Sequence, residues 1–158
     1  ARNITAPAHL GVQGGSNGGL LTGNMLTQYP ELFGAVVVQV PLLDMQRYNK
    51  LLAGASWMAE YGDPDKPEEW AFIQKFSPYH LFDPAREYPA TILLTSTRDD
   101  RVHPGHARKM FAKMQEAGKD VRYYENIEGG HGGAADNRQA AHMDALYLTF
   151  LWQQLAPR

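Results

Sequence analysis

Cysteine is absent from this sequence of 158 residues. The absence excludes disulfide bonds, cysteine-ligated zinc and thiol catalysis. It leaves the redox environment open, because a chain without cysteine tolerates both oxidising and reducing compartments. Long hydrophobic runs are also missing, and none approaches the roughly 20 residues of a membrane-spanning helix. We therefore predict no membrane partner, and our expectation for the location is cytoplasmic.

A strong charge of one sign is missing as well. Lys and Arg number 15 against 17 Asp and Glu, which gives a formal net charge of −2. Nucleic acid is held by a basic field that this balance does not supply. The histidines show no paired metal-ligand spacing, except that His103 and His106 lie three apart at the start of an expected helix, where they can also solvate the helix N-terminus. We predict no nucleic-acid partner, no metal and no cofactor.

The size and composition suit one packed domain. A chain of 158 residues with 44% hydrophobic residues can bury a core but is too short for two domains. The sequence does not begin with Met and has no apolar signal core near its start, so we expect a processed, excised or engineered piece of a protein. The prediction is a single domain over residues 1–158, with residues 42–89 forming a cap or pocket wall within it.

Apolar runs alternate with amphipathic segments along the chain. Four runs have the composition of buried parallel strands, at residues 9–14, 35–40, 90–95 and 121–127. Helical patterns follow the first, third and fourth of these runs, at residues 17–28, 104–117 and 134–155. Strands that alternate with helices are typical of a parallel sheet. We predict a three-layer α/β fold with a mainly parallel sheet of about four strands and helices on both faces.

Residues 42–89 depart from this alternation. Prolines divide the segment into short helices and turns, at positions 64, 67, 78, 84 and 89. Its aromatic side chains supply apolar surface, and packing is the expected role for most of them: Trp57, Tyr61, Trp70, Phe72, Phe76, Tyr79 and Phe82. A wall of this kind beside the sheet could line a pocket.

A glycine-rich segment joins the first expected strand to the first expected helix. It contains G-x-S-x-G at Gly14, Ser16 and Gly18, which is the spacing of a nucleophile elbow. The serine of such an elbow takes a strained backbone conformation, and glycine two residues to either side removes clashes. Ser16 Oγ would stand over a helix N-terminus, where developing negative charge is stabilised. The other interpretations are an inert turn and a phosphate-binding loop, and the Lys and Ser/Thr of a P-loop are missing.

Two later residues complete a catalytic pattern. Asp99 follows the third expected strand, and His131 lies on a loop flanked by glycines after the fourth. The chain order Ser16, Asp99, His131, each just past a strand, is the order that α/β-hydrolases use. In that chemistry His131 takes the proton of Ser16 as its oxygen attacks an acyl carbon. Asp99 holds the imidazole tautomer and stabilises its cation.

The acid could instead be the neighbouring carboxylate, Asp100. We prefer Asp99, because the apolar Val102 then lies three positions further on. That spacing leaves Asp100 and Arg101 to face outward or to line the site. Both assignments place a carboxylate where the third strand opens towards the carboxyl edge of the sheet.

Six segments carry a resemblance to a known family. They read GGSNGGLL from residue 14, YPELFGAVV from 29, WMAEYGDP from 57, SPYH from 77, DDRVHPGHARKM from 99 and GGHGG from 129. Together they resemble the prolyl oligopeptidase family of serine peptidases over nearly the whole chain. That family joins an α/β-hydrolase catalytic domain to a β-propeller that restricts access to small peptides. The resemblance implies the same fold and the same chemistry here.

The resemblance also implies roles by position. Ser16 is then the nucleophile, Asp99 the orienting acid and His131 the base, and the backbone N–H of Asn17 is one oxyanion donor. The implied substrate-binding residues are Trp57, which stacks on the proline ring of the substrate, Tyr61 and Val102, which line the same pocket, and Arg101, which binds the peptide backbone of the substrate.

The likeness covers only the carboxyl-terminal half of the hydrolase domain. The propeller, the first strands of the sheet and the segment that supplies a tyrosine hydroxyl as second oxyanion donor have no counterpart. Strand 9–14 would therefore be an edge, and a long apolar edge is a pairing hazard. We predict a truncated α/β-hydrolase that forms a homodimer through strand 9–14 and hydrolyses small esters better than peptides. The rival hypothesis is a non-catalytic folding or interaction fragment that retains an inherited triad.

Overall fold

The computed structural model describes residues 4–156, so the ends of the predicted domain 1–158 lie outside the described residues. Its centre is a sheet of four parallel strands in the order β1-β2-β3-β4. The strands are β1 (Gly11–Gly15), β2 (Ala35–Gln39), β3 (Ala90–Ser96) and β4 (Val121–Asn126). The parallel sheet predicted from the sequence is confirmed, and β1 lies at one edge of it.

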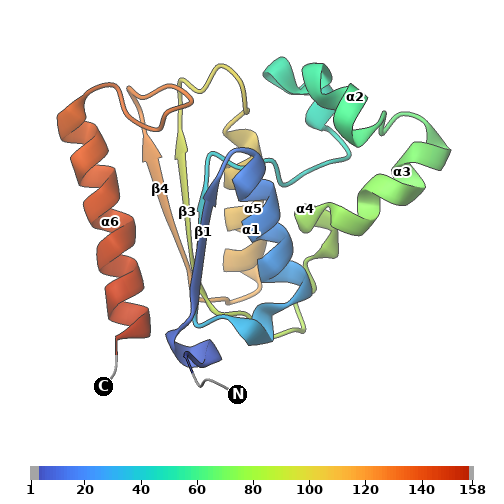
Figure 1. The fold of residues 1–158 in the computed structure, drawn as a ribbon. Helices are drawn as coiled ribbons and strands as arrows, with labels where there is room; N and C mark the ends of the chain where they lie inside the picture. The colour runs from blue at the N-terminus through green and yellow to red at the C-terminus, as the bar shows by residue number, and fades with distance from the viewer. Residues whose placement is uncertain (1–3, 157–158) are drawn as a thin grey trace.

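Helices cover both faces of the sheet (Figure 1). The long helix α6 (Asn137–Leu155) lies on one face, and α1 (Asn17–Gln28) and α5 (Gly105–Glu116) lie on the other. Each crossover returns the chain to the amino end of the next strand, so all strands run the same way. The three-layer α/β architecture is confirmed. The carboxyl ends of the strands share one edge of the sheet, at the top of Figure 1.

Each face of the sheet has its own apolar core. The core under α1 and α5 includes Leu26, Val36, Val38, Leu93, Met110 and Met114. The core under α6 includes Ala35, Val37, Ile92, Leu94, Met143 and Phe150. Successive residues of β2 and β3 alternate between the two cores, because the side chains of a strand point to opposite faces. Burial on both faces explains why these strands are nearly continuous in apolar residues.

Residues 42–89 form short helices at one side of the sheet (Figure 1). These helices are η3 (Tyr48–Lys50), η4 (Leu52–Trp57), α2 (Met58–Tyr61), α3 (Pro67–Ile73), η5 (Gln74–Phe76) and α4 (Pro78–Leu81). Pro67 and Pro78 stand at the start of their helices, where a missing N–H costs no hydrogen bond. A third apolar cluster joins this segment to α1 and to the loop after β3, through Leu20, Leu42, Met45, Tyr48, Ile73 and Val102.

Element boundaries differ from the sequence-based ones by a few residues, although α1 has the predicted bounds. The strand expected at 9–14 begins only at Gly11, because Pro7 starts the short helix η1 (Pro7–His9). The strand expected at 121–127 ends at Asn126, and Ile127 is 71% exposed. The helix expected from residue 134 begins at Asn137, because the Asp136 carboxylate caps it by accepting the Gln139 N–H at 2.8 Å.

Candidate active site

Ser16 lies at the sharp turn between β1 and α1, with φ 59° and ψ −117°. Its N–H donates to the carbonyl of Gln39 on β2 at 2.9 Å, which fixes the turn to the sheet. A Cβ at Gly14 would lie 2.3 Å from the carbonyl oxygen of Gly18, so glycine is required there. The clash expected at Gly18 is wrong, because a Cβ there meets nothing within 4 Å among the described residues outside its own helix backbone.

Gly19 is the second glycine that the turn requires. A Cβ at Gly19 would lie 2.8 Å from both the carbonyl oxygen of Gln39 and the Cβ of Pro41. The helix α1 can therefore approach the end of β2 only because this position has no side chain. The sequence placed the second steric constraint one residue too early, since a spacing pattern does not show which backbone segments touch.

Ser16, His131 and Asp99 form one hydrogen-bonded row. His131 Nε2 lies 3.0 Å from Ser16 Oγ, and His131 Nδ1 lies 2.8 and 3.0 Å from the two carboxylate oxygens of Asp99. A carboxylate can only accept, so the proton of the neutral ring is on Nδ1 and Nε2 offers its lone pair to the Ser16 hydroxyl. The Asp99 side chain is fully buried and that of His131 is 10% exposed.

The loop after β3 holds the acid in place. Asp99 Oδ1 accepts the backbone N–H groups of Arg101 and Val102 at 2.9 and 2.8 Å. The carboxylate that faces His131 is that of Asp99, whereas Asp100 is exposed. Of the two candidate acids, the geometry favours Asp99.

The N-terminus of α1 opens onto Ser16 Oγ. Asn17 is the first residue of α1, and the first N–H groups of a helix have no intrahelical partner. The Asn17 N–H can therefore donate to a ligand oxygen near Ser16. The Asn17 side chain is itself held, because the Tyr61 hydroxyl donates to Asn17 Oδ1 at 2.5 Å. Burial raises the pKa of Tyr61, so this hydroxyl remains a donor at neutral pH.

The implied pocket residues fall into two groups. Val102 is buried in the third apolar cluster, and Trp57 and Tyr61 pack against that cluster while remaining partly exposed. These three residues therefore share one apolar wall. Arg101 lies outside the wall, with its side chain exposed beside the Asp99 loop. An exposed guanidinium beside a partly open apolar wall suits a ligand with both polar and apolar parts.

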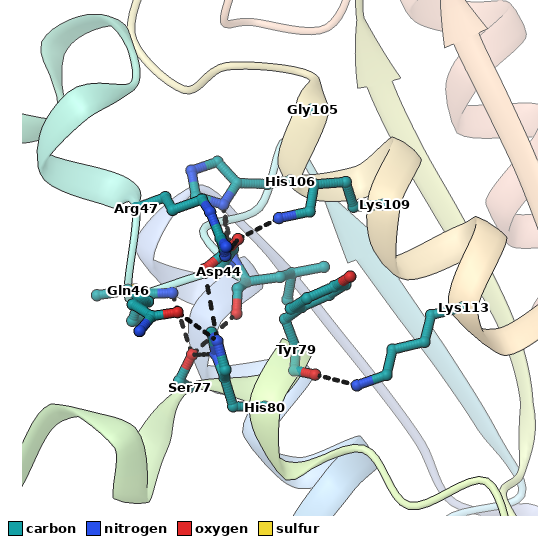
Figure 2. A network of polar contacts seen from close by, with 12 residues as sticks. Asp44, Gln46, Arg47, Ser77, Tyr79, His80, Gly105, His106, Lys109 and Lys113 are labelled. Carbon is teal, nitrogen blue, oxygen red and sulfur yellow. Dashed lines mark hydrogen bonds and ion pairs between the residues drawn. The ribbon is translucent and has the colours of Figure 1, made fainter. Parts of the chain in front are cut away.

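A buried polar network anchors the back of this wall, and Figure 2 shows it around Asp44. Asp44 Oδ2 accepts from Arg47 Nη1 at 3.0 Å and from Lys109 Nζ. Burial alone would raise the pKa of Asp44, but Lys109 and Arg47 outweigh it and hold the pKa below its usual range. The carboxylate therefore stays ionised, and it joins the loop after β2 to α5.

His106 strengthens the same junction from the first turn of α5. Its Nδ1 accepts the backbone N–H groups of Leu43 and Asp44 at 3.2 and 3.0 Å. Burial lowers the pKa of His106 to about 4, so the ring is neutral. His106 follows the Asp99 loop directly, and the network thus fixes the wall segment relative to the acid.

Sequence reasoning missed this network and a cavity near the site. An ionisable residue inside the apolar run at 41–45 was the available signal for Asp44. The cavity, of about 230 Å³, lies between the ends of β1 and β2 and the His131 loop, and its lining includes Gly15, Gln39, Leu94, Gly132 and Met143. No sequence pattern indicated it, because its walls come from distant segments.

The described residues 4–156 lack both a metal-ion cluster and a membrane-spanning helix. They contain no cluster of three or more His, Cys, Asp or Glu side chains placed to hold a metal ion. Within the same residues, no helix is both long and apolar enough to cross a bilayer.

The fold and the elbow define the class: the chain has an α/β-hydrolase architecture with a serine at its strained strand-to-helix turn. It matches the prolyl oligopeptidase family over residues 1–158. The chain belongs to this family of serine peptidases, as the resemblance predicted.

Similar proteins support the assignment of the chain to this family. The chain is 51% identical to an uncharacterised peptidase of Sinorhizobium fredii over 98% of its own length and 21% of that protein. It is 37% identical to a prolyl endopeptidase of Elizabethkingia miricola over 92% of its length and 21% of that enzyme. A solved post-proline cleaving enzyme from Rickettsia typhi aligns with a TM-score of 0.91, 40% identity, and coverage of 98% of this chain and 22% of that one. The chain thus spans about a fifth of the length of the relatives it matches.

Proposed function

We propose that this chain carries the catalytic apparatus of a serine peptidase, with Ser16 as nucleophile, His131 as general base and Asp99 as the orienting acid. The observation that carries the proposal is the bridging position of the His131 ring, 3.0 Å from Ser16 Oγ and 2.8 Å from Asp99. Serine, imidazole and carboxylate in this order can deprotonate the hydroxyl and stabilise the resulting imidazolium. Membership of a serine peptidase family supports the same assignment.

The reaction proceeds by acyl transfer. Ser16 Oγ attacks the acyl carbon while its proton moves to His131 Nε2, and the Asn17 N–H donates to the oxygen that becomes negative. His131 then gives the proton to the leaving amine or alcohol as the bond to it breaks. A water molecule then attacks the same carbon of the acyl-enzyme while it loses a proton to His131. His131 returns this proton to Ser16 Oγ as the bond between Oγ and the acyl carbon breaks, which releases the acid.

We propose proline-containing peptides as the natural substrate class. Relatives are named as prolyl endopeptidases, and the wall of Trp57, Tyr61 and Val102 suits a flat, apolar proline ring. Arg101 would bind the carbonyl groups of the peptide backbone from its exposed position beside the acid loop.

For the 158-residue chain by itself we propose preferential hydrolysis of activated esters. Asn17 supplies one oxyanion donor, and the loss of one donor in a comparable enzyme costs roughly 100- to 1000-fold in turnover. Amides are less reactive than activated esters and depend more on oxyanion stabilisation, so the rate of peptide cleavage should fall most. Rates on a chromogenic ester and on a matched proline anilide test this. Equal rates on both would contradict it.

Phosphonate labelling tests the mechanism. A fluorophosphonate should label the wild-type chain at Ser16, and Ser16→Ala should abolish both labelling and ester turnover. Because the triad acts as a unit, replacement of any member should lower turnover by orders of magnitude. Unchanged ester hydrolysis in Ser16→Ala would refute this mechanism. A wild-type chain with neither labelling nor turnover would favour the rival function, a non-catalytic folding or interaction fragment. The single partial catalytic domain over 1–158 and the cytoplasmic location stay predictions.

A further inference from the structure

Asn126 is the last residue of β4 and stands just before the loop that carries His131. Only 5% of its surface is exposed. A buried amide has two donor and two acceptor positions to satisfy, and an unpaired one is costly. The partners of this side chain therefore show what it holds.

The Asn126 side chain contacts the loop on both sides of His131. Its Oδ1 accepts the backbone N–H groups of Glu128 and Gly129 at 3.0 and 3.2 Å. Its Nδ2 donates to the carbonyl oxygen of Gly133 at 3.0 Å, beyond the histidine, and to Gln139 Oε1 at 2.8 Å. One amide thus ties the start and the end of the loop to each other and to the first turn of α6.

The loop itself has little intrinsic stiffness. Four glycines flank His131 at positions 129, 130, 132 and 133, and glycine restricts the backbone least. The loop is nevertheless folded back on itself, since a Cβ at Gly129 would lie 2.6 Å from the carbonyl oxygen of Gly133. Gly133 has φ +83° and donates its N–H to the carbonyl of Gly130 at 2.9 Å. Because glycines restrict the backbone so little, residues outside the glycines must hold the loop in this tightly folded conformation.

We infer that Asn126 is a positioning residue for the general base, holding the backbone on both sides of His131 so that Nε2 meets Ser16 Oγ. The inference rests on the proposed function, in which His131 takes the serine proton. Asp99 orients the ring through Nδ1, and the backbone N–H groups that its Oδ1 accepts belong to its own loop rather than to the loop backbone on which the ring is mounted. Asn126 acts on that backbone. The two residues therefore control different degrees of freedom of the imidazole.

Substitution of Asn126 by Ala tests the inference. A misplacement of about 1 Å at a reacting group can cost on the order of 100-fold, so the rate of Ser16 phosphonylation and kcat on an ester should fall roughly 10- to 100-fold. KM should change little, because Trp57, Tyr61 and Val102 lie on other segments. Ile127→Ala is the matched control, since this neighbouring side chain is 71% exposed, and it should retain the wild-type rates.

Asn126→Asp separates positioning from folding. Aspartate keeps the acceptor for the Glu128 and Gly129 N–H groups but cannot donate to Gly133, so its labelling rate should lie between those of Asn126→Ala and the wild type. This variant carries the test if Asn126→Ala does not fold. An Asp variant no faster than the Ala variant, or an Ala variant with wild-type rates, would overturn the inference.

Proton NMR provides a readout that does not require activity. The Nδ1 proton that His131 shares with Asp99 should give a downfield resonance in the wild type and in Ile127→Ala, and it should shift or broaden in Asn126→Ala. An unchanged resonance overturns the positioning role even if the protein proves inactive. Conversely, a wild type that shows this resonance but no Ser16 labelling would refute the proposed function alone.

Discussion

The conformation of Ser16 costs stability, and the surrounding structure enforces it. A φ of 59° is rarely adopted by residues with a side chain and costs on the order of 1–3 kcal/mol. The hydrogen bond from the Ser16 N–H to Gln39 fixes the turn to the sheet. The turn can pack this closely only because Gly14 and Gly19 have no side chains. The strain places Oγ at the helix N-terminus, within 3.0 Å of His131 Nε2 and next to the backbone N–H of Asn17.

Two adjacent carboxylates give a sharp test at the residue scale. Asp99→Asn should lower kcat by about 10⁴-fold, because an amide at this position no longer enforces the Nδ1-protonated tautomer, as in the comparable triad substitution. Asp100→Asn is the matched control: it removes the same charge from an exposed position and should change kcat by less than about threefold. Steady-state kinetics on an ester substrate measure kcat for both variants. A larger loss in Asp100→Asn would move the acid to that residue.

The Tyr61 hydroxyl connects the apolar wall to Asn17, the proposed oxyanion donor. Tyr61→Phe keeps the aromatic wall but removes the 2.5 Å hydrogen bond to Asn17 Oδ1. A single hydrogen bond contributes about 0.5–1.5 kcal/mol, so kcat should fall about two- to tenfold while KM for a proline substrate stays similar. Tyr29→Phe, at a tyrosine that is 46% exposed, should have no effect. A change in KM alone would show that Tyr61 acts only as pocket surface.

Among the elements, α5 and the loop after β2 form the rigid side of the site. His106 and Lys109, both on α5, bind residues 43–44 of that loop. The Asp99 loop enters α5 immediately before His106, so the acid and the apolar wall are fixed to one helix. On the opposite side, the side chains of Asn126 and Gln139 hold the His131 loop and join it to the first turn of α6.

The buried His106 predicts a pH dependence of stability. Its pKa is lowered from 6.5 to about 4, mainly by burial, with Asp44, Lys109 and His103 as the nearby charged groups. Between these values the unfolded chain binds a proton that the folded chain does not. The free energy of unfolding should therefore fall as the pH drops from about 6.5 to about 4, by up to roughly 3 kcal/mol. His80, whose pKa burial also lowers, adds in the same direction.

Urea denaturation across this pH range measures the effect. His106→Asn keeps an acceptor for the two backbone N–H groups but cannot titrate, so its stability should depend less steeply on pH than that of the wild type. Parallel curves for the two proteins would show that His106 does not contribute. Any slope that remains in the variant reports on His80 and on the carboxylates.

For the whole molecule, the open edge of the sheet is the prominent feature. Ser16 donates to Gln39, and Leu10 accepts from Gly34, so the even-numbered residues of this stretch face β2. Odd-numbered residues such as Gln13 then point their N–H and C=O groups away from the sheet. Such a row is a template for pairing with another strand. We propose that two copies of the 158-residue chain pair through this edge, with two-fold symmetry.

Sedimentation at micromolar concentration tests the predicted dimer. Gln13→Pro removes one outward N–H and leaves the groups that face β2 in place, so it should shift the chain towards the monomer. Gln13→Ala is the control, because it removes the same side chain but keeps the N–H. The wild type and Gln13→Ala should sediment as dimers. A stable wild-type monomer would refute the pairing.

The sequence predicted the strands and helices well, because each is a local pattern. Runs nearly continuous in Val, Leu and Ile predicted β2 and β3, and the α1 boundaries agree with the structure at both ends. The predicted boundaries are wrong where a capping residue sets the end of a helix. Asp136 caps α6, so α6 begins later than the apolar periodicity suggested. Pro7 likewise delayed β1 by starting a short helix. Periodicity does not register such single-residue signals.

The same distinction between local sequence patterns and tertiary contacts applies to the candidate site. Chain order and glycine spacing alone pointed to Ser16, Asp99 and His131, because the carboxyl ends of parallel strands must share one edge of the sheet. The spacing to Val102 already favoured Asp99 over Asp100. The contact with His131 that supports this choice, the steric need at Gly19 rather than Gly18, and the anchoring roles of Asp44, His106 and Asn126 all required the tertiary structure. Each depends on a contact that periodicity and spacing do not encode, over a few residues for Asn126 and over more than 60 for His106, and only the folded backbone determines which groups touch.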